Sequence, residues 1–381
     1  MDIIKRLDLG PYFTFEPSKS KPIYNWFYYK EAYSPELVEK LALELNLSAP
    51  ILDPFSGIGT TALFAKSLGM QAYGIDSSQL AVFAGQVKTE DYSEKDLEDA
   101  RAFLKDVFQH KDSSSRLRWD FELFQVEKVF PPANLRDILF LREKIAGVQN
   151  EKAMRLLLLA LVSILPMCGF ILKDGGVLKI EKKSVAPVRE VFKRKTKRML
   201  SDLENAPKGP RPEILLGDAR SMPFENESMN SIITSPPYLN NIDYTKVYGL
   251  EISLLEMDLS STRNARGRSV RSFITSDAKA EEIPEEAYEY GCRIPVAGTY
   301  FADMEKVLKE SFRALKPGGT AVFVVGNSVI RETHIPVDEI LAQIGERLGF
   351  ESEIWIGLER IADVKPAKVK TRESAIVFRK P

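Results

Sequence analysis

The chain has 381 residues, of which 44% are hydrophobic and 28% are charged, and its formal net charge is −1. This composition is ordinary for a soluble globular protein with a sizeable core, and the length suits one large domain or two moderate ones. No apolar run approaches the about 20 residues that span a bilayer, and the first ten residues lack an apolar stretch of signal-peptide length. We therefore expect a cytoplasmic protein that binds no membrane. A net charge near zero requires any nucleic-acid contact to come from local basic patches.

Potential metal ligands are scarce and scattered. Cys168 and Cys292 lack CxxC spacing, and His110 and His334 lie far from them in the sequence. Because metal sites need several ligands at short, recurring spacings, we expect no metal and no disulfide scaffold.

In chain order, apolar runs typical of buried strands end at polar or turn residues, and helical patterns lie between several of them. The predicted strands cover residues 50–52, 71–75, 213–216, 230–234, 320–325, 353–358 and 374–379. The predicted helices cover residues 34–45, 60–68, 300–315 and 337–348. Strands alternating with helices predict an α/β fold with a parallel sheet covered on both faces. Ligands of such sheets bind beyond the carboxyl ends of the strands, where the polar residues fall.

Two stretches interrupt this alternation. Residues 88–212 are largely helical in pattern and contain a basic run between Lys179 and Arg198, so we expect an inserted helical subdomain. Residues 239–298 are rich in Arg, Ser and Glu, and we expect an extended loop region that ends near Gly298. A basic run can be a solvated surface as readily as a nucleic-acid site.

The first motif, ILDPFSGIGTT, follows a predicted strand and begins at Ile51. Glycines in its turn let the backbone approach a ligand closely, and the helix that follows presents free N–H groups to a carboxylate. A glycine pair alone would equally make a structural turn. The full string resembles the S-adenosylmethionine-binding loop of the amino-directed DNA methyltransferases. The resemblance implies cofactor contacts by Asp53, Phe55, Gly57, Gly59 and Thr60.

Acidic residues close the next two predicted strands. Asp76 lies about 20 residues beyond the glycine loop, where an acid can accept hydrogen bonds from both ribose hydroxyls. Alone it would serve equally as a helix N-cap, but its spacing from the loop favours a ligand. Asp218 and Ala219 follow a third strand. The same resemblance implies that Asp218 faces the adenine amino group, with a capping role as the alternative.

The second motif is Thr-Ser-Pro-Pro-Tyr, which follows the predicted strand 230–234. Two prolines fix the backbone and remove two donors, so carbonyls there can point outward. The lone pair of a base amine is delocalised into the ring, and methyl transfer requires acceptors that localise it. Ser235 and the Pro236 carbonyl can accept these hydrogen bonds, and Tyr238 can stack on a base that has left the duplex. We therefore predict a catalytic set of Ser235, Pro236, Pro237 and Tyr238.

The residue before Pro-Pro distinguishes related enzymes. Asp or Asn is common there in adenine-directed and in RNA- or protein-directed relatives, whereas Ser is typical of the cytosine-N4 enzymes. The chain therefore most resembles cytosine-N4-specific DNA methyltransferases. Three alternatives stay open: N6-adenine methylation, RNA base-amine methylation, and a catalytically inactive nucleic-acid-binding protein. The cofactor loop precedes the Pro-Pro motif, whereas many cytosine-N4 enzymes have the reverse order, so position alone does not locate the target-recognition region.

The resemblance covers about residues 22–85 and 213–381, whereas residues 88–212 match no family pattern. It implies a Rossmann-like class I methyltransferase fold with a mostly parallel seven-stranded sheet and a helical insertion. Residues 1–87 and 213–381 would form the catalytic domain, and residues 88–212 an inserted subdomain for DNA or target recognition. The aromatic segment 25–38 resembles the motif that covers the methionine end of the cofactor, although it could equally belong to the core.

The implied cofactor is S-adenosylmethionine, and the implied substrate is double-stranded DNA in a restriction–modification or related defence system with a partner protein. Basic side chains in the loop after the catalytic motif are the candidates for contacts with phosphates or bases. These are Arg263, Arg266, Arg268 and Arg271.

Overall fold

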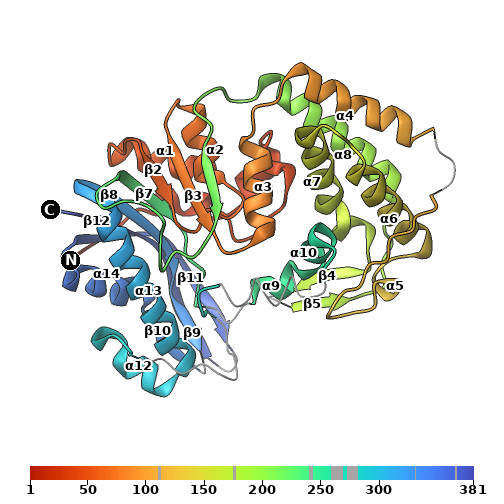
Figure 1. Ribbon diagram of the computed structural model, residues 1–381. Helices are drawn as coiled ribbons and strands as arrows, with labels where there is room; N and C mark the ends of the chain where they lie inside the picture. The colour runs from red at the N-terminus through yellow and green to blue at the C-terminus, as the bar shows by residue number, and fades with distance from the viewer. Residues whose placement is uncertain are drawn as a thin grey trace.

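The structure is a computed structural model, shown in Figure 1. It describes residues 1–109, 113–174, 177–239, 243–258, 269–272, 282–330, 332–364 and 367–381. The strands are β1 (Asp2–Lys5), β2 (Ile51–Asp53), β3 (Ala72–Asp76), β4 (Ile171–Asp174), β5 (Val177–Ile180), β6 (Glu213–Leu216), β7 (Met229–Thr234), β8 (Leu315–Gly326), β9 (Ser328–Ile330), β10 (Thr333–Ile335), β11 (Glu351–Val364) and β12 (Ala367–Arg379). The α-helices are α1 (Pro35–Glu44), α2 (Thr60–Ser67), α3 (Gln79–Thr89), α4 (Glu94–Val107), α5 (Val126–Val129), α6 (Pro132–Ala146), α7 (Glu151–Cys168), α8 (Val188–Asp202), α9 (Tyr244–Val247), α10 (Gly249–Glu256), α12 (Tyr288–Arg293), α13 (Pro295–Ala314) and α14 (Val337–Arg347). Short 3₁₀ turns are η1 (Leu7–Tyr12), η2 (Glu16–Ser20), η3 (Tyr24–Trp26), η4 (Leu203–Asn205) and η5 (Glu285–Ala287).

Within the described residues, the main sheet has the strand order β1-β11-β12-β8-β7-β2-β3-β6. Strand β12 runs antiparallel to β8 and β11, whereas the other neighbours in the sheet are parallel. This order confirms the α/β fold of the S-adenosylmethionine-dependent methyltransferases. All seven predicted strands are present, and the strand pair near the C-terminus is a long hairpin.

Among the residues that the structure describes, the sheet has eight strands and not the seven expected, because β1 adds parallel to the edge strand β11. The four residues of β1 are exposed, so no buried apolar pattern marks them as a strand. Strand β1 is held instead by hydrogen bonds to backbone groups of the edge strand β11 that would otherwise lack a partner.

Helices cover both faces of the sheet. On one face, α1 packs on aliphatic residues of β7, β8 and β12. On the other face, α13 and α14 pack on β8, β11 and β12. Helix α13 begins at Pro295, earlier than the predicted start at residue 300. Because the strands between these layers are buried on both sides, they read in the sequence as continuous apolar runs.

Residues 88–212 contain the helices α4 to α8, in keeping with the helical pattern of the sequence. They also contain the paired strands β4 and β5, which the sequence pattern did not reveal. Figure 1 shows α4, α6, α7 and α8 gathered beside α3, away from β12. One continuous apolar core joins these helices to α3, α10 and the segment around Trp26. The core is centred on α7, whose residues from Leu156 to Val162 are all buried. Within the described residues, no helix is long and apolar enough to cross a membrane.

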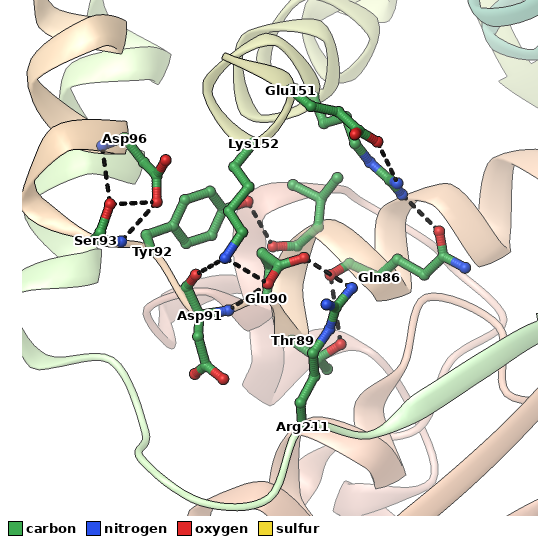
Figure 2. Close-up of polar contacts among 12 residues, drawn as sticks. Gln86, Thr89, Glu90, Asp91, Tyr92, Ser93, Asp96, Glu151, Lys152 and Arg211 are labelled. Carbon is green, nitrogen blue, oxygen red and sulfur yellow. Dashed lines mark hydrogen bonds and ion pairs between the residues drawn. The ribbon is translucent and has the colours of Figure 1, made fainter.

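Polar contacts tie the two ends of this stretch together (Figure 2). Glu90, just after α3, lies 2.8 Å from Arg211 and 3.2 Å from Lys152 of α7. Lys152 also donates to the Asp91 carbonyl at 2.6 Å. Ser93 caps α4 in a reciprocal capping box. Partly exposed ion pairs of this kind contribute little stability each. Together they hold the segment after α3, where residues 88–212 begin, next to the segment before β6, where they end.

Residues 239–298 were expected to form an extended loop, and the structure corrects this expectation. Where described, the stretch contains α9, α10, η5, α12 and the start of α13, so Gly298 lies inside a helix. Helix α10 is buried from Gly249 to Leu255. A helix that is buried on every side shows no amphipathic period, so the periodicity of the sequence could not indicate it.

Candidate active site

A cavity of about 620 Å³ opens at the carboxyl edge of the sheet. Both sequence motifs line it, although almost 180 residues separate them. The predicted site residues on its wall are Asp53, Phe55, Gly57, Thr60, Asp76, Ser235, Pro236, Pro237 and Tyr238. The strand order brings them together because β7 and β3 both pair with β2.

The glycine turn between β2 and α2 depends on backbone conformations that other residues rarely adopt. Gly57 has φ +48° and Gly59 has φ +79°. A Cβ on Gly59 would lie 3.1 Å from the Gly85 Cα of α3, so Gly59 holds α2 close to α3 and is not on the cavity wall. Gly57 lines the cavity, where an added Cβ would lie 3.7 Å from the ring of Tyr29. The two glycines therefore have different roles.

Asp76 ends β3 beside this turn. Its Oδ2 accepts a hydrogen bond from the Gly57 N–H at 2.9 Å, and its Oδ1 accepts one from the Ser78 N–H at 2.8 Å. Ser78, and not Asp76, is the N-cap of α3. Burial raises the pKa of Asp76 to about 6, and the nearby Asp53 adds to the rise. The carboxylate is thus oriented by the backbone while it faces the cavity, as a ribose ligand would require.

Asp53 links the two motifs. Its Oδ1 accepts hydrogen bonds from Thr234 Oγ1 at 2.6 Å and from the Phe55 N–H at 3.2 Å, and its Oδ2 accepts one from the Tyr33 hydroxyl at 3.0 Å. The side chain is buried, and burial raises its pKa to about 6. Because Thr234 directly precedes Ser235, this carboxyl group joins the glycine turn to the start of the second motif.

Aromatic residues form the part of the cavity wall next to Gly57 of the glycine turn. Tyr29 stacks on Tyr248 with ring centroids 4.7 Å apart, and the Tyr248 hydroxyl donates to Glu31 at 2.7 Å. Lys173 of β4 lies 3.9 Å from the centre of the Tyr248 ring and pairs with the buried Glu251 at 2.6 Å. The segment expected to cover the cofactor therefore lies at the cavity, and the β4–β5 hairpin supports it.

The Ser-Pro-Pro-Tyr motif leaves β7 at the centre of the sheet. Burial raises the pKa of Tyr238 well above its ordinary value, Glu373 adds to the rise, and a hydrogen bond with Ser235 opposes it. A Cβ on Gly326 would lie 3.0 Å from the Tyr238 ring, so a larger residue there would require the ring to shift. Ser328 donates to the carbonyl of Leu239, which fixes the backbone just after the motif.

Other predicted residues lie elsewhere. Asp218 binds Arg220 through both carboxylate oxygens, with Nη2–Oδ2 at 2.7 Å, and Ala219 is buried in the core. Neither is on the cavity wall. Arg271 pairs with the buried Asp303 at 2.8 Å. Three of the four predicted DNA-contacting arginines lie outside the described residues: Arg263, Arg266 and Arg268.

The first basic run is partly used in structural contacts. Arg189 pairs with Asp137 at 3.0 Å, Lys183 donates to the Ile171 carbonyl, and Lys195 donates to the Asn25 carbonyl. Among the residues that the structure describes, no group of three or more His, Cys, Asp or Glu side chains could hold a metal ion.

Sequence reasoning missed several residues of the cavity wall. A lysine in the β4–β5 hairpin and an arginine and a glutamate of the β11–β12 hairpin line it: Lys173, Arg360 and Glu373. Of these three residues, only Glu373 could have been noticed in the sequence, because it is a charged residue directly before the predicted strand 374–379. The other two lie in basic stretches that resemble solvated surface.

No protein-family model matches the chain. The chain is 25% identical over 447 residues to type II methyltransferase M.BsoBI of Geobacillus stearothermophilus, which covers 97% of this chain and 87% of the relative. It is 28% identical over 410 residues to type II methyltransferase M.AvaI of Nostoc sp., which covers 89% of this chain and 81% of the relative. A SAM-dependent methyltransferase structure from Methanosarcina mazei is 11% identical and overlaps 87% of this chain and 92% of that one at a TM-score of 0.32, too low to add to what the strand order shows.

The cavity also suits the cofactor of this fold, S-adenosylmethionine. Gly57 leaves room for close approach at positive φ, Asp76 presents oriented acceptors, and aromatic rings and Glu31 offer apolar faces and negative charge to a sulfonium and an amino group. Strand order, glycine turn and relatives therefore agree on this cofactor.

Proposed function

We propose that this chain, which is similar over most of its length to type II methyltransferases, is a DNA methyltransferase that modifies the N4 amine of cytosine. The substrate would be double-stranded DNA, and the biological setting a restriction–modification or related defence system with a partner protein. The observation that carries the proposal is the shared cavity: the glycine turn and the Ser-Pro-Pro-Tyr motif line one space at the carboxyl edge of the sheet.

The chemistry follows from the acceptors of the second motif. S-adenosylmethionine supplies the methyl group when it is bound. The Ser235 hydroxyl and the Pro236 carbonyl accept hydrogen bonds from the two N–H groups of the base amine, and this orients the nitrogen lone pair out of the base plane. Asp53 holds Thr234 directly before Ser235, and Ser235 and Pro236 both line the cavity. A fixed geometry of this kind can supply much of the rate through positioning.

A serine acceptor suffices if the amine loses its proton to solvent after transfer. An aspartate in its place would accept more strongly, and adenine-directed relatives commonly have one. The serine therefore favours cytosine N4 over adenine N6. Tyr238 would stack on the base after it leaves the duplex, at a cost of a few kcal/mol for unstacking.

The described residues suggest how DNA would reach the cavity. The β4–β5 hairpin supplies Lys173 on one side of the cavity, and the β11–β12 hairpin supplies Arg360 on the other. Residues 88–212 would thus act as a recognition subdomain facing the catalytic domain. The loop arginines after Tyr238 would contribute phosphate contacts to the same surface.

The test is methyl transfer from tritiated S-adenosylmethionine to duplex DNA, tRNA and protein, followed by mass spectrometry of the digested DNA. We expect label in DNA and N4-methylcytosine as the product. N6-methyladenine alone would overturn the base assignment and keep the mechanism, whereas label in tRNA or protein only would overturn the DNA assignment. 5-Methylcytosine, or a covalent complex trapped with fluorinated cytosine, would overturn the mechanism.

Cysteine variants test whether the reaction instead uses a cysteine nucleophile that forms a covalent bond to the base. Cys168 is buried and Cys292 is exposed, and neither is on the cavity wall. Cys168→Ala and Cys292→Ala should therefore both retain activity. Loss of turnover in either variant, with the fold intact, would point to nucleophilic catalysis.

A further inference from the structure

One carboxyl group interrupts an otherwise aliphatic face of the sheet. The residues of β8 and β12 that pack toward α1 include Val324, Ala375 and Val377, all buried. Glu373 is the next position of β12 on this face toward the carboxyl edge, and it is only 6% exposed. Its described ion pair is with Arg360, Nη2–Oε1 3.0 Å, and the arginine is 56% exposed. A surface cation compensates poorly for burying a carboxylate, so the fold alone gives no reason for an acid here.

Glu373 lies beside the catalytic motif. It is paired in register with Gly326, and a Cβ on Gly326 would lie 3.0 Å from the Tyr238 ring and 3.5 Å from the Glu373 Cγ. The two side chains therefore meet over this glycine, and both line the cavity. Ser235, three residues before Tyr238, lines the same cavity. The carboxyl group thus faces the space where the target amine would be held.

The edge of cytosine that carries the amine presents an N–H donor at N4 and an acceptor at N3. In the proposed arrangement Ser235 and Pro236 accept from both N–H groups of the amine, so N3 is the group left without a partner. The O–H of a neutral carboxylic acid can donate to it. We propose that Glu373, as a neutral acid, donates a hydrogen bond to the ring nitrogen beside the amine of the flipped base, and so selects a base that carries an amine next to a ring acceptor. Thymine, with N3–H and O4, would place donor against donor. This inference rests on the proposed function.

The surroundings of Glu373 favour the neutral form. Burial raises the pKa of Glu373, and Arg360 on β11 opposes the rise. Among the described residues, the Tyr238 hydroxyl on the loop after β7 is a second titratable neighbour, and the position of β8 paired with Glu373 is Gly326. A hydrogen bond from the Glu373 O–H to the ring nitrogen of the base would favour the neutral form of Glu373 further.

The test compares Glu373→Ala and Glu373→Gln on duplexes with cytosine or 3-deazacytosine at the target position, which methylation-aware sequencing would identify first. We expect Glu373→Ala to lower kcat/KM on cytosine on the order of 10- to 100-fold. Glu373→Gln should stay within a few-fold of the wild type, because its amide also donates. For the wild type, kcat/KM should be lower on 3-deazacytosine than on cytosine by a similar factor, because 3-deazacytosine lacks the ring acceptor. For Glu373→Ala, kcat/KM should be the same on the two bases. S-adenosylmethionine affinity should not change.

Glu359→Gln is the matched control, because Glu359 neighbours Arg360 on the same strand but pairs with Lys5 at the surface. It should behave as the wild type. With rising pH, kcat/KM should fall in the wild type and not in Glu373→Gln, and Arg360→Ala should move the fall to higher pH. A Gln variant as impaired as the Ala variant, or an Ala variant as sensitive to 3-deazacytosine as the wild type, would overturn the inference. Wild-type protein that methylates no DNA would instead overturn the proposed function.

Discussion

Removing the Asp76 carboxylate tests the cofactor site most directly. Its two oxygens are oriented by the N–H groups of Gly57 and Ser78, and each keeps a lone pair for a hydroxyl in the cavity. Hydrogen bonds to a charged group contribute about 1.5–3 kcal/mol. Asp76→Ala should therefore raise the Kd for S-adenosylmethionine roughly 10- to 150-fold. Isothermal titration calorimetry measures this, with Asp99→Asn on α4 as a control far from the cavity. Unchanged affinity in Asp76→Ala would remove Asp76 from the site.

The pH dependence of this binding provides a second measurement. Burial raises the pKa of Asp76 to about 6 in the ligand-free protein. Ribose hydroxyls need the ionised form as acceptor, so affinity should be highest above pH 6 and decrease as the pH falls through 6. Asp76→Asn cannot titrate and should bind weakly with no such dependence near pH 6. The raised pKa also means that the ligand-free fold loses stability as the pH rises from about 4 to 6, and Asp76→Asn should remove that contribution. Wild-type affinity that rose on acidification would contradict this account.

Three further predictions concern turnover, DNA binding and stability. Tyr238→Ala should lower turnover sharply and leave S-adenosylmethionine affinity nearly intact, as stopped assays and calorimetry would show; a parallel loss of both would place Tyr238 in the cofactor site. Alanine at Arg263, Arg266 and Arg268 should lower the salt slope of DNA binding by up to about three; an unchanged slope would exclude this loop from the DNA surface. Burial lowers the pKa of Lys88 to about 7, with Lys195 adding to the effect, and its ammonium has no hydrogen-bond partner among the described residues. The unfolded chain therefore binds more protons than the folded one between pH 7 and 10.5, so the lysine destabilises the fold in this range. Lys88→Met should increase the free energy of unfolding by up to roughly 4 kcal/mol at pH 7 and progressively less toward pH 10. Urea denaturation at both pH values measures this, and equal effects at the two would argue against it.

Arg271 is left out of the DNA-binding variant for a structural reason. Its guanidinium pairs with Asp303, which is 1% exposed and also 3.0 Å from Arg220. Removing Arg271 would leave a buried carboxylate with one partner fewer, which destabilises a fold. A loss of DNA binding in such a variant would not distinguish a lost contact from a weakened fold.

Local patterns were enough to predict seven strands of the main sheet, most of the helices on it and the two motifs. A buried strand, a glycine turn and a helix start occupy consecutive residues, so the sequence around Gly57 shows all three at once. The same holds for Ser235 and the prolines after β7. Asp76 could be predicted to lie beside the glycine loop because it ends the next strand of the pattern, and it lines the same cavity. Each of these features depends on backbone preference and side-chain period within short segments.

Contacts between distant strands could be learned only from the tertiary structure. The bond from Thr234 to Asp53 spans 181 residues, and the approach of Glu373 to Tyr238 depends on β12 lying antiparallel beside β8. Helix α10 gave no amphipathic signal because it is buried on every side. Arg271 looked like a free cation because the sequence does not show that Asp303, 32 residues away, is buried against it. Strand order and helix packing decide which charges meet, and neither is encoded in the period of any single segment.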